Sequence, residues 1–280
     1  MKKLHWSHAD IFSGLEGDYI KSFTHYDYMM EFHTHSFYEL NIVLTGHGEH
    51  LIEGMRCEAS RGCVFVIPPN VRHSYKNHSG LNVYHMLIHR DFFSNCFSEF
   101  RKTVGFPLLF EVEPFFRAQY RENMFLILSD KELDTVLRDI ELIQSYEQAL
   151  DKNLYINAVA KKLLAFLCME ITKQIGDGEI HSAPKNELLD IADSLSFIHL
   201  NYEEKITIDL LAKRQNMSRA TYIRHFTKIC GCSPHQYLTQ YRIKKASEAI
   251  TSQDKPITEV AQSCGFYDAS HLRKHLNRKK

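Results

Sequence analysis

Leu211-Ala212-Lys213-Arg214-Gln215-Asn216-Met217 is followed by Tyr222, Arg224 and Phe226, and the same pattern returns near the end of the chain. The second copy is Val260-Ala261-Gln262-Ser263-Cys264-Gly265-Phe266, followed by Leu272, Lys274 and Leu276. Each copy has a small alanine in a short helix and a turn residue four positions on. An apolar residue, a cation and an apolar residue then alternate along a second helix. Helix, tight turn and helix form a helix-turn-helix unit, so the repeat predicts two such units.

The segments around these copies carry the start signals of short helices. One helix is expected over residues 188–201, and five more are expected to start at Thr207, Ser218, Ser233-Pro234, Pro256 and Asp268. Residues 185–280 hold 16 lysines and arginines against 10 acidic residues, whereas the rest of the chain holds 18 against 24. The net charge of zero therefore hides a basic last third, which indicates that this end meets a polyanion.

Residues 188–280 resemble the DNA-binding domain of AraC/XylS-type transcriptional regulators. The family normally continues beyond the position of Lys280, and it usually has phenylalanine, arginine and phenylalanine where this chain has Leu272, Lys274 and Leu276. We therefore expect Leu272 and Leu276 to be less covered than Tyr222 and Phe226. The residues that carry the resemblance are Leu211-Ala212, Ser218, Arg224, Phe226, Gly231-Cys232-Ser233-Pro234, Tyr237-Leu238, Arg242-Ile243, Ala246, Ile257, Val260-Ala261, Gly265-Phe266, Asp268 and Ser270-His271.

The second helix of such a unit lies in the major groove, with its N-terminal part at the base edges. Tyr222 and Phe226 are expected to face the core, and the opposite face then presents Arg219, Ala220, Ile223, Arg224, Thr227 and Lys228. The resemblance implies base reading at Ala220, Ile223 and Arg224, while Thr227 and Lys228 are expected on phosphate. A guanidinium can bond two acceptors at once, which favours Arg224 as the main contact. The alternative for each residue is an ordinary solvated helix face.

The matching face of the second unit comprises Ala269, Ser270, His271, Arg273 and Lys274. A lysine offers a point charge in place of a fork, so we expect less base discrimination there than in the first unit.

Residues from about 20 to 90 have the short, β-branched and aromatic runs of a sandwich or barrel. Strands are expected at 40–44, 64–67 and 83–89, with turns at Thr45-Gly46 and near Gly54. Within this region, His33-Thr34-His35-Ser36-Phe37-Tyr38-Glu39 leads to Gly46, and Gly62, Pro68-Pro69-Asn70, His73 and Asn77 follow. This spacing resembles the two cupin motifs, with Asp27 and Asn70 where the motifs have glycine. Asparagine also tolerates a positive φ.

The resemblance implies that His33, His35, Glu39 and His73 share one site inside the barrel. Three imidazoles and a carboxylate suit a divalent transition metal. The same residues could instead contact an organic ligand, or only pack the barrel. We expect an organic ligand, with Phe37 or Tyr38 supplying an aromatic face, no obligatory metal and no cofactor.

Two amphipathic helices are expected over residues 131–175. Leu133, Val136, Leu137, Ile140 and Ile143 mark the first stripe, and Ile156, Val159, Ala160, Leu163, Leu164 and Leu167 mark the second. These stripes could pack on the barrel or form a dimer interface, and we expect a homodimer. A linker is expected at 175–184, where glycine, serine and proline gather.

The predicted architecture is α+β and multidomain. It comprises a cupin-like barrel (1–100), a helical linker and dimerisation region (101–184), and an all-α domain with two helix-turn-helix units (185–280). Seven scattered cysteines without a CxxC pair fit a reducing cytosol, and no apolar run is long enough for a membrane span.

These features predict a ligand-responsive regulator in the cytoplasm. Its expected partners are double-stranded promoter or operator DNA, a small-molecule effector such as a sugar or glycoside, a second copy of the chain, and RNA polymerase if it activates. No membrane partner is expected. One rival is a metal-dependent cupin enzyme, which leaves the helical last third without a purpose. The other is a sugar-binding module that acts by protein contact.

Overall fold

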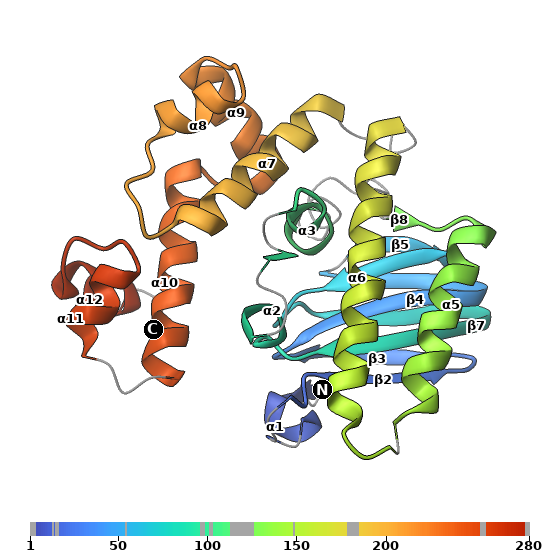
Figure 1. Ribbon diagram of the computed structural model, residues 1–280. Coiled ribbons are helices and arrows are strands. Elements are labelled where there is room, and N and C mark those ends of the chain that lie inside the picture. The colour runs from blue at the N-terminus through green and yellow to red at the C-terminus, as the bar shows by residue number, and fades with distance from the viewer. Residues whose placement is uncertain are drawn as a thin grey trace. The chain divides into compact units, whose positions relative to one another are not determined.

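The computed structural model describes residues 4–12, 14, 17–53, 55–95, 99–100, 103–112, 126–147, 149–177, 185–252 and 256–277. The chain divides into two compact units, Met1–Lys185 and Asn186–Lys280 (Figure 1). The first unit is rich in strands and the second is helical, so the fold is α+β. In the part of the chain that is described, no helix is long and apolar enough to cross a membrane.

The first unit is built on one curved sheet in which the long strands β4 and β7 pair along most of their length. The opposite edge of β4 pairs with β5 and β6, and the opposite edge of β7 pairs with β2 and β3. The strands are β1 (Leu4–Trp6), β2 (Ile20–His25), β3 (Met30–His35), β4 (Tyr38–Ile52), β5 (Met55–Ser60), β6 (Cys63–Ile67), β7 (His73–Ile88) and β8 (Leu126–Ile127).

The strand predictions at 40–44 and 64–67 are confirmed, the one at 83–89 forms the last part of β7, which ends at Ile88, and the predicted turn at Thr45-Gly46 is wrong. β4 continues through this point with shifts in its register against β7. Gly46 has φ 74°, and a Cβ there would lie 2.1 Å from the carbonyl oxygen of Gly80. The glycine thus allows a bulge and a close strand crossing. The turn expected near Gly54 joins β4 to β5, although Gly54 itself lies outside the described residues.

Two long helices of the first unit lie side by side across the sheet in Figure 1. They are α5 (Asp130–Ser145), which starts at a capping box formed by Ser129 and Glu132, and α6 (Lys152–Asp177). The predicted apolar stripes are buried within the chain, apart from half-buried Leu137, so they form core. The predicted linker begins too early, because α6 continues to Asp177. The shorter helices are α1 (His8–Ile11), α2 (Phe92–Asn95), α3 (Gly105–Pro107) and η2 (Leu108–Val112).

The second unit consists of six helices within the described residues, as predicted. Thr207 and Ser218 cap their helices through their hydroxyl oxygens, and Asp268 Oδ1 accepts from the backbone N–H of His271. The helices are α7 (Lys185–Asn201), α8 (Ile208–Arg214), α9 (Arg219–Cys230), α10 (Pro234–Ser252), α11 (Ile257–Ser263) and α12 (Ala269–Asn277).

Candidate functional site

The two helix-turn-helix units have matching turns. Ala212 and Ala261 are buried, and each is followed four positions on by a residue with left-handed backbone, Asn216 (φ 52°) and Gly265 (φ 73°). In both units the backbone N–H of the next residue donates to the alanine carbonyl at 2.9 Å. α8 and α9 therefore meet through the same turn as α11 and α12, as the sequence repeat predicts.

The turn of the second unit is anchored to the rest of the helical unit. Arg242, on α10, donates from Nε to the carbonyl of Tyr202 and from Nη2 to that of Glu204, both at 2.7 Å. A Cβ on Gly265 would lie 2.7 Å from the same Tyr202 oxygen, so only glycine fits this close approach.

The predicted DNA-contact face of α9 is turned to solvent. Tyr222 and Phe226 are fully buried, as expected. Exposed positions on the other face are Arg219, Ala220, Arg224, Thr227 and Lys228, with Ile223 half-buried. Arg219 pairs with Asp209 at 3.1 Å and Lys228 with Glu187 at 3.6 Å, whereas Arg224 has no ion-pair partner among the described residues. Surface pairs of this kind are weak, so they leave these cations available to phosphate.

The corresponding face of α12 is exposed at Ser270, His271, Arg273 and Lys274, and half-buried at Ala269. The imidazoles of His271 and His275 lie 3.2 Å apart, between their Nε2 atoms, one turn along this helix. The prediction that Leu272 is poorly covered is wrong. Leu272 is completely buried against a cluster that includes Ile243, Val260 and Phe266. The same prediction is confirmed for Leu276, which is half-buried.

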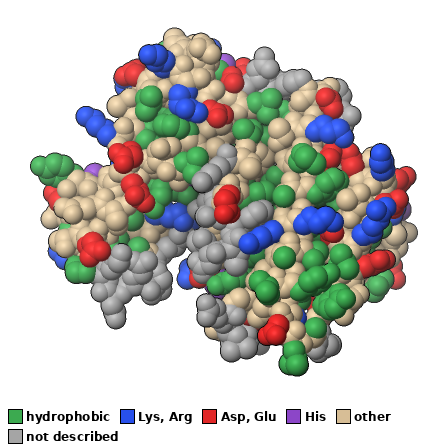
Figure 2. Space-filling view, in the orientation of Figure 1, with side chains coloured by type: hydrophobic (Ala, Val, Ile, Leu, Met, Phe, Trp, Pro, Cys, Tyr) green, Lys and Arg blue, Asp and Glu red, His purple; other side chains and the backbone are tan. Residues whose placement is uncertain are grey.

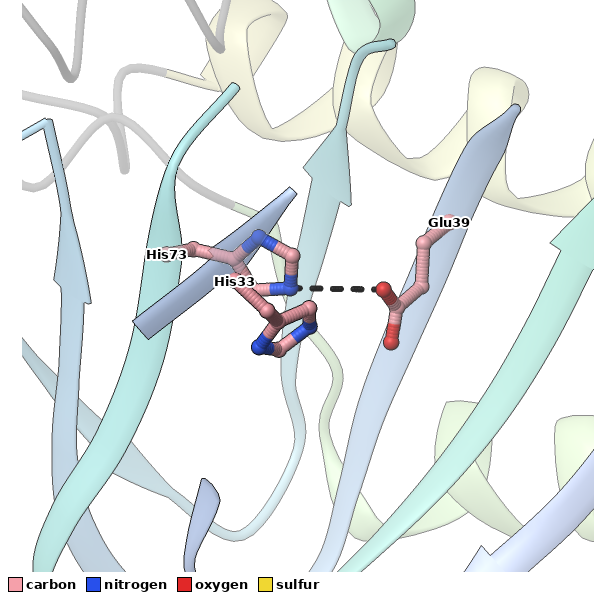
Figure 3. A group of neighbouring side chains, drawn as sticks. All are labelled: His33, Glu39 and His73. Carbon is pink, nitrogen blue, oxygen red and sulfur yellow. Dashed lines mark ion pairs between the residues drawn. The ribbon is translucent and has the colours of Figure 1, made fainter. Parts of the chain in front are cut away.

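The four predicted sensor residues do come together inside the barrel, and all are buried (Figure 3 shows three of them). His33 and His73 are register partners on β3 and β7, and Glu39 approaches them from β4. Glu39 Oε2 lies 2.9 Å from His35 Nε2 and 3.3 Å from His73 Nε2. Two residues that replace motif glycines keep a glycine-like backbone, Asp27 at φ 50° and Asn70 at φ 67°.

The three histidines are held in the same orientation by main-chain carbonyls. Nδ1 of His33 lies 2.9 Å from the oxygen of Glu31, Nδ1 of His35 lies 2.7 Å from that of Phe37, and Nδ1 of His73 lies 3.3 Å from that of Val71. A carbonyl only accepts, so each Nδ1 carries the hydrogen. A neutral ring then has its lone pair on Nε2. The Nε2 atoms of His35 and His73 face the carboxylate yet lack hydrogen-bond geometry to it.

Charge in this cluster is concentrated on Glu39. Burial favours the neutral acid, but the contacts from His35, His73 and His85 hold the pKa of Glu39 well below its usual range. Burial, together with the neighbouring His73, lowers the pKa of His33 to about 4. An ionised carboxylate therefore sits beside a neutral His33 at pH 7.

His85 is a member of this cluster that the sequence interpretation missed. Its Nδ1 lies 2.7 Å from Glu39 Oε1, the carboxylate oxygen that His35 and His73 leave free, and its ring is buried. The available signal was a histidine inside the apolar run of strand β7. Periodicity alone did not separate this inward-facing ring from the hydrophobic residues around it.

Phe37 and Tyr38, the two aromatic residues predicted to contact the ligand, have different surroundings. Phe37 reaches the cluster and stacks on His35 with ring centroids 4.6 Å apart, but its ring is packed in a core cluster with Phe12 and Leu87. Tyr38 packs against Phe93 and Phe110 instead. Residues 36–37 form a bend between β3 and β4, yet the predicted alternation holds, because residues 33, 35, 37 and 39 are all buried and residues 34, 36 and 38 are only half-buried.

The donor set fits a divalent metal. The ligand atoms of His33, Glu39 and His73 all lie within 4.8 Å of one another. Ligands about 2.1 Å from a shared ion are separated by about 3.0–3.4 Å, which is close to the His35–Glu39 and His73–Glu39 distances. Carbonyl-bound Nδ1 atoms are also the usual support for metal-binding imidazoles.

Comparisons with known proteins found family matches for both halves of the chain. Residues 19–158, half of the 280, match the AraC-like ligand binding domain, and residues 211–280 match a helix-turn-helix domain. A similar curated protein is the HTH-type transcriptional activator RhaS of Yersinia pestis bv. Antiqua (strain Angola). It is 27% identical over 240 residues, which cover 86% of this chain and 82% of the relative.

Two solved structures are also similar. The DNA-binding domain of AdpA in complex with a target DNA is 31% identical, and the match covers 32% of this chain and 81% of that chain with a TM-score of 0.31. ToxT from Vibrio cholerae O395 is 10% identical, and the match covers 91% of this chain and 93% of that chain with a TM-score of 0.37.

Proposed function

The chain belongs to the AraC family of ligand-responsive, DNA-binding transcriptional regulators, and from this premise we propose that its barrel binds a sugar or glycoside that governs promoter binding. The observation that carries this proposal is the pairing of two matching helix-turn-helix units with a barrel that buries a charged, histidine-rich cluster. Binding can switch such a protein only if the ligand favours one arrangement of sensor and DNA-binding unit over another.

The DNA contacts we propose follow the exposed faces of α9 and α12. Arg224 reads a base, with Ala220 and Ile223 beside it, while Arg219, Thr227 and Lys228 bind phosphate. α12 contributes mostly backbone contacts through Ala269, Ser270, His271, Arg273 and Lys274. Its cations and small polar side chains suit phosphate better than base discrimination.

The effector contacts we propose are the polar atoms of His33, His35, Glu39 and His73. A sugar offers hydroxyl groups that can donate to a carboxylate and accept from an imidazole. A buried polar site binds such a ligand selectively, because an analogue without the hydroxyl would leave these groups unpaired. In this reading Phe37 orients the His35 ring, and Tyr38 holds the start of β4 against Phe93 and Phe110.

A second candidate occupant is a divalent transition metal, favoured by the uniform Nδ1-to-carbonyl bonds of His33, His35 and His73. These residues and Glu39 would hold it, and it would supply a positive centre for a hydroxyl or carboxylate of the effector. In that case the metal would serve sensing, which is in keeping with the chain's membership of a family of regulators.

We further propose a homodimer through α5 and α6, acting in the cytoplasm and contacting RNA polymerase if the regulator activates. The residues of the predicted stripes are buried in the core, but other apolar side chains on these helices and between them stay exposed. Leu154 and Met169 on α6 are 81% and 60% exposed, and Leu150, between α5 and α6, is 97% exposed. Figure 2 shows hydrophobic side chains gathered on this part of the first unit. A patch of this kind on a regulator is best explained by a partner surface.

The direct experiment is a footprint of the full chain on the DNA that flanks its own coding region. Two helix-turn-helix units on one face of the duplex should protect segments about one helical turn apart. Arg224→Ala should remove the protection nearest one end and leave the other. A uniform, unstructured protection that random DNA competes away would count against sequence-specific binding.

A further inference from the structure

Two histidines on α12 form a close pair of imidazoles at the surface of the helical unit. His271 is one of the proposed DNA contacts, whereas His275 is not. The two residues are four positions apart, so one helical turn brings their rings to the same side of the helix. Their Nε2 atoms lie 3.2 Å apart and their ring centroids 4.9 Å apart. His271 is exposed and His275 is half-buried, so the pair is open to solvent.

The short distance between the two nitrogens requires a shared hydrogen or a shared cation. Two N–H groups aimed at each other would repel, so at least one Nε2 presents its lone pair to the other. Zinc binds imidazole nitrogen at about 2.0–2.1 Å, and two tetrahedral ligands are then about 3.3–3.4 Å apart. The observed 3.2 Å is close to this separation. Two histidines at the same spacing on one helix face also bind the metal in the zinc-protease helix motif.

Phe266, in the turn before α12, holds both rings in place. Its ring meets that of His271 edge to face, with centroids 5.5 Å apart, and lies 6.1 Å from the ring of His275. Phe266 is itself buried, and its backbone N–H donates to the carbonyl of Ala261 in the turn. The two imidazoles therefore lose little further freedom when an ion binds, which favours binding.

The pair is particular to the second helix-turn-helix unit. The sequence repeat aligns His271 and His275 with positions 221 and 225 of α9, where the first unit has Thr221 and His225. The hydroxyl of Thr221 accepts a hydrogen bond from Ser218, the helix cap. The first unit therefore folds the same way with a single imidazole at these positions, so the fold does not require the pair.

We propose that His271 and His275 bind one divalent transition metal ion, Zn²⁺ above all, and that this ion joins α12 to a DNA phosphate. Two protein ligands leave coordination positions open for water in the free chain and for a phosphate oxygen in the complex. The proposal rests on the proposed function, because α12 has to face DNA.

The charges around the pair couple the ion to DNA. Arg273 and Lys274 are exposed next to His271 and repel a cation in the free chain, whereas the phosphates of bound DNA attract it. DNA therefore strengthens the binding of the ion. By linkage, the ion strengthens the binding of DNA by the same factor.

The first test is calorimetric titration of the full chain with Zn²⁺. An exposed site with two protein ligands gives up its ion during purification, so the ion is added back. His275→Gln removes one ligand at a residue outside the proposed DNA contacts. This variant should bind one equivalent of zinc fewer than wild type, whatever the barrel cluster binds. His235→Gln is the matched control, because His235 is exposed on α10, and it should bind zinc like wild type.

Equal zinc stoichiometry in wild type and His275→Gln would overturn the site and leave only a hydrogen bond between the two rings. Loss of one equivalent in His235→Gln as well would overturn it too, since any surface histidine would then give the same result.

The second test is the salt dependence of DNA binding. With zinc, wild type should bind its footprinted site more tightly, and the slope of log affinity against log salt should steepen by about one, because one more phosphate is neutralised. His275→Gln should bind DNA like metal-free wild type and should not respond to zinc. An unchanged slope in wild type would overturn the phosphate contact even where zinc binds. Metal-free wild type that does not prefer its site over random DNA would instead contradict the proposed function itself.

Discussion

Arg224 is the side chain on which we expect base reading to depend most. It is exposed on α9, carries no ion pair with any residue described, and sits on the face opposite buried Tyr222 and Phe226. Arg224→Ala should cost roughly 1–3 kcal/mol of binding on the specific site and less on random DNA, because only the specific site offers its guanidinium a matched base edge. Gel-shift titrations on both DNAs measure the difference.

Lys244→Ala is a suitable control for the loss of one charge, because Lys244 is exposed on α10, outside both proposed reading helices. This substitution should weaken binding to the specific and the random DNA only slightly and by the same amount. If Arg224→Ala lost the same free energy on specific and random DNA, Arg224 would be a phosphate contact, and base reading would have to lie elsewhere.

His33 makes the barrel sensitive to acid. Burial lowers its pKa to about 4, below the value of 6.5 for an unperturbed histidine. Between these two pH values the unfolded chain binds a proton that the folded chain does not. The free energy of unfolding is therefore highest above pH 6.5 and falls as the pH drops toward 4. Urea titrations followed by the fluorescence of Trp6, the only tryptophan, report the barrel, since Trp6 contacts His33 at 4.8 Å.

His33→Gln should flatten this pH dependence without abolishing it, because burial also lowers the pKa of His8 to about 4. A slope in the variant as steep as in wild type would show that His33 is already protonated in the folded chain. That result would also require a different account of the charge around Glu39.

Residue spacing identified most of the sensor cluster but not all of it. His33, His35, Glu39 and His73 were predictable, because alternation and a known motif fix their shared face. His85 was not, since a single histidine in an apolar run does not show that it faces a carboxylate. The alternation of this segment puts Phe37 on the face of the cluster and Tyr38 on the opposite face, so Tyr38 was a poor candidate for an aromatic contact from the sequence alone.

At the level of elements, the turn between α11 and α12 depends on one glycine. Gly265→Ala should cost about 1–2 kcal/mol for the left-handed backbone alone, and more for the contact with the Tyr202 carbonyl. Amide exchange should then be faster across residues 257–277 and unchanged in α9. Asn216→Gly, at the same point of the first unit, should be nearly neutral, because glycine accepts a φ of 52°. Unchanged exchange in Gly265→Ala would mean that the turn relaxes.

The exposed apolar side chains of α5 and α6 predict a dimer. The full chain should sediment as a dimer at micromolar concentration, and Leu154→Asp should shift it to monomer, because the interface would then bury an unpaired charge. Tyr267→Asp, at a residue 91% exposed on the helical unit, is the control and should stay dimeric. A wild-type chain that sediments as a monomer at tens of micromolar would rule out this interface.

Helix boundaries were more predictable than strand boundaries. The caps Thr207, Ser218 and Asp268 are local signals, because the side chain bonds the backbone only two or three residues away. The length of β4 is not local. It depends on Gly46 meeting Gly80 on a strand more than thirty residues later, so the sequence near Gly46 reads as a turn although the strand continues.

At the scale of the whole molecule, the main alternatives are a metal and an organic effector in the barrel cluster. An organic effector can pair with the polar atoms of these imidazoles and of Glu39 without any ion, so we predict substoichiometric metal in purified protein and a melting temperature unchanged by a chelator. A structural metal would instead add its binding free energy to folding. Elemental analysis showing near one metal per chain, lost together with stability in His73→Ala, would establish the second candidate.

The order of a strand-rich part followed by a helical part was predictable. The net charge, the hydrophobic period and the sequence repeats all change along the chain, from alternating strands to short capped helices. The function of the α5 and α6 stripes was not, since an apolar stripe does not reveal what covers it. In the structure both stripes pack within the chain, and the apolar side chains that stay exposed, such as Leu150 and Leu154, lie off the predicted pattern.

We infer that this chain reads a DNA sequence through its two helix-turn-helix units. The most direct measurement is the affinity of the full chain for its footprinted site and for a scrambled duplex of the same length, at physiological salt. Specific regulators bind their sites at least about a thousandfold more tightly than non-specific DNA. We predict a ratio of that order for this chain, and a smaller ratio for Arg224→Ala. Equal affinities for the two duplexes would contradict it.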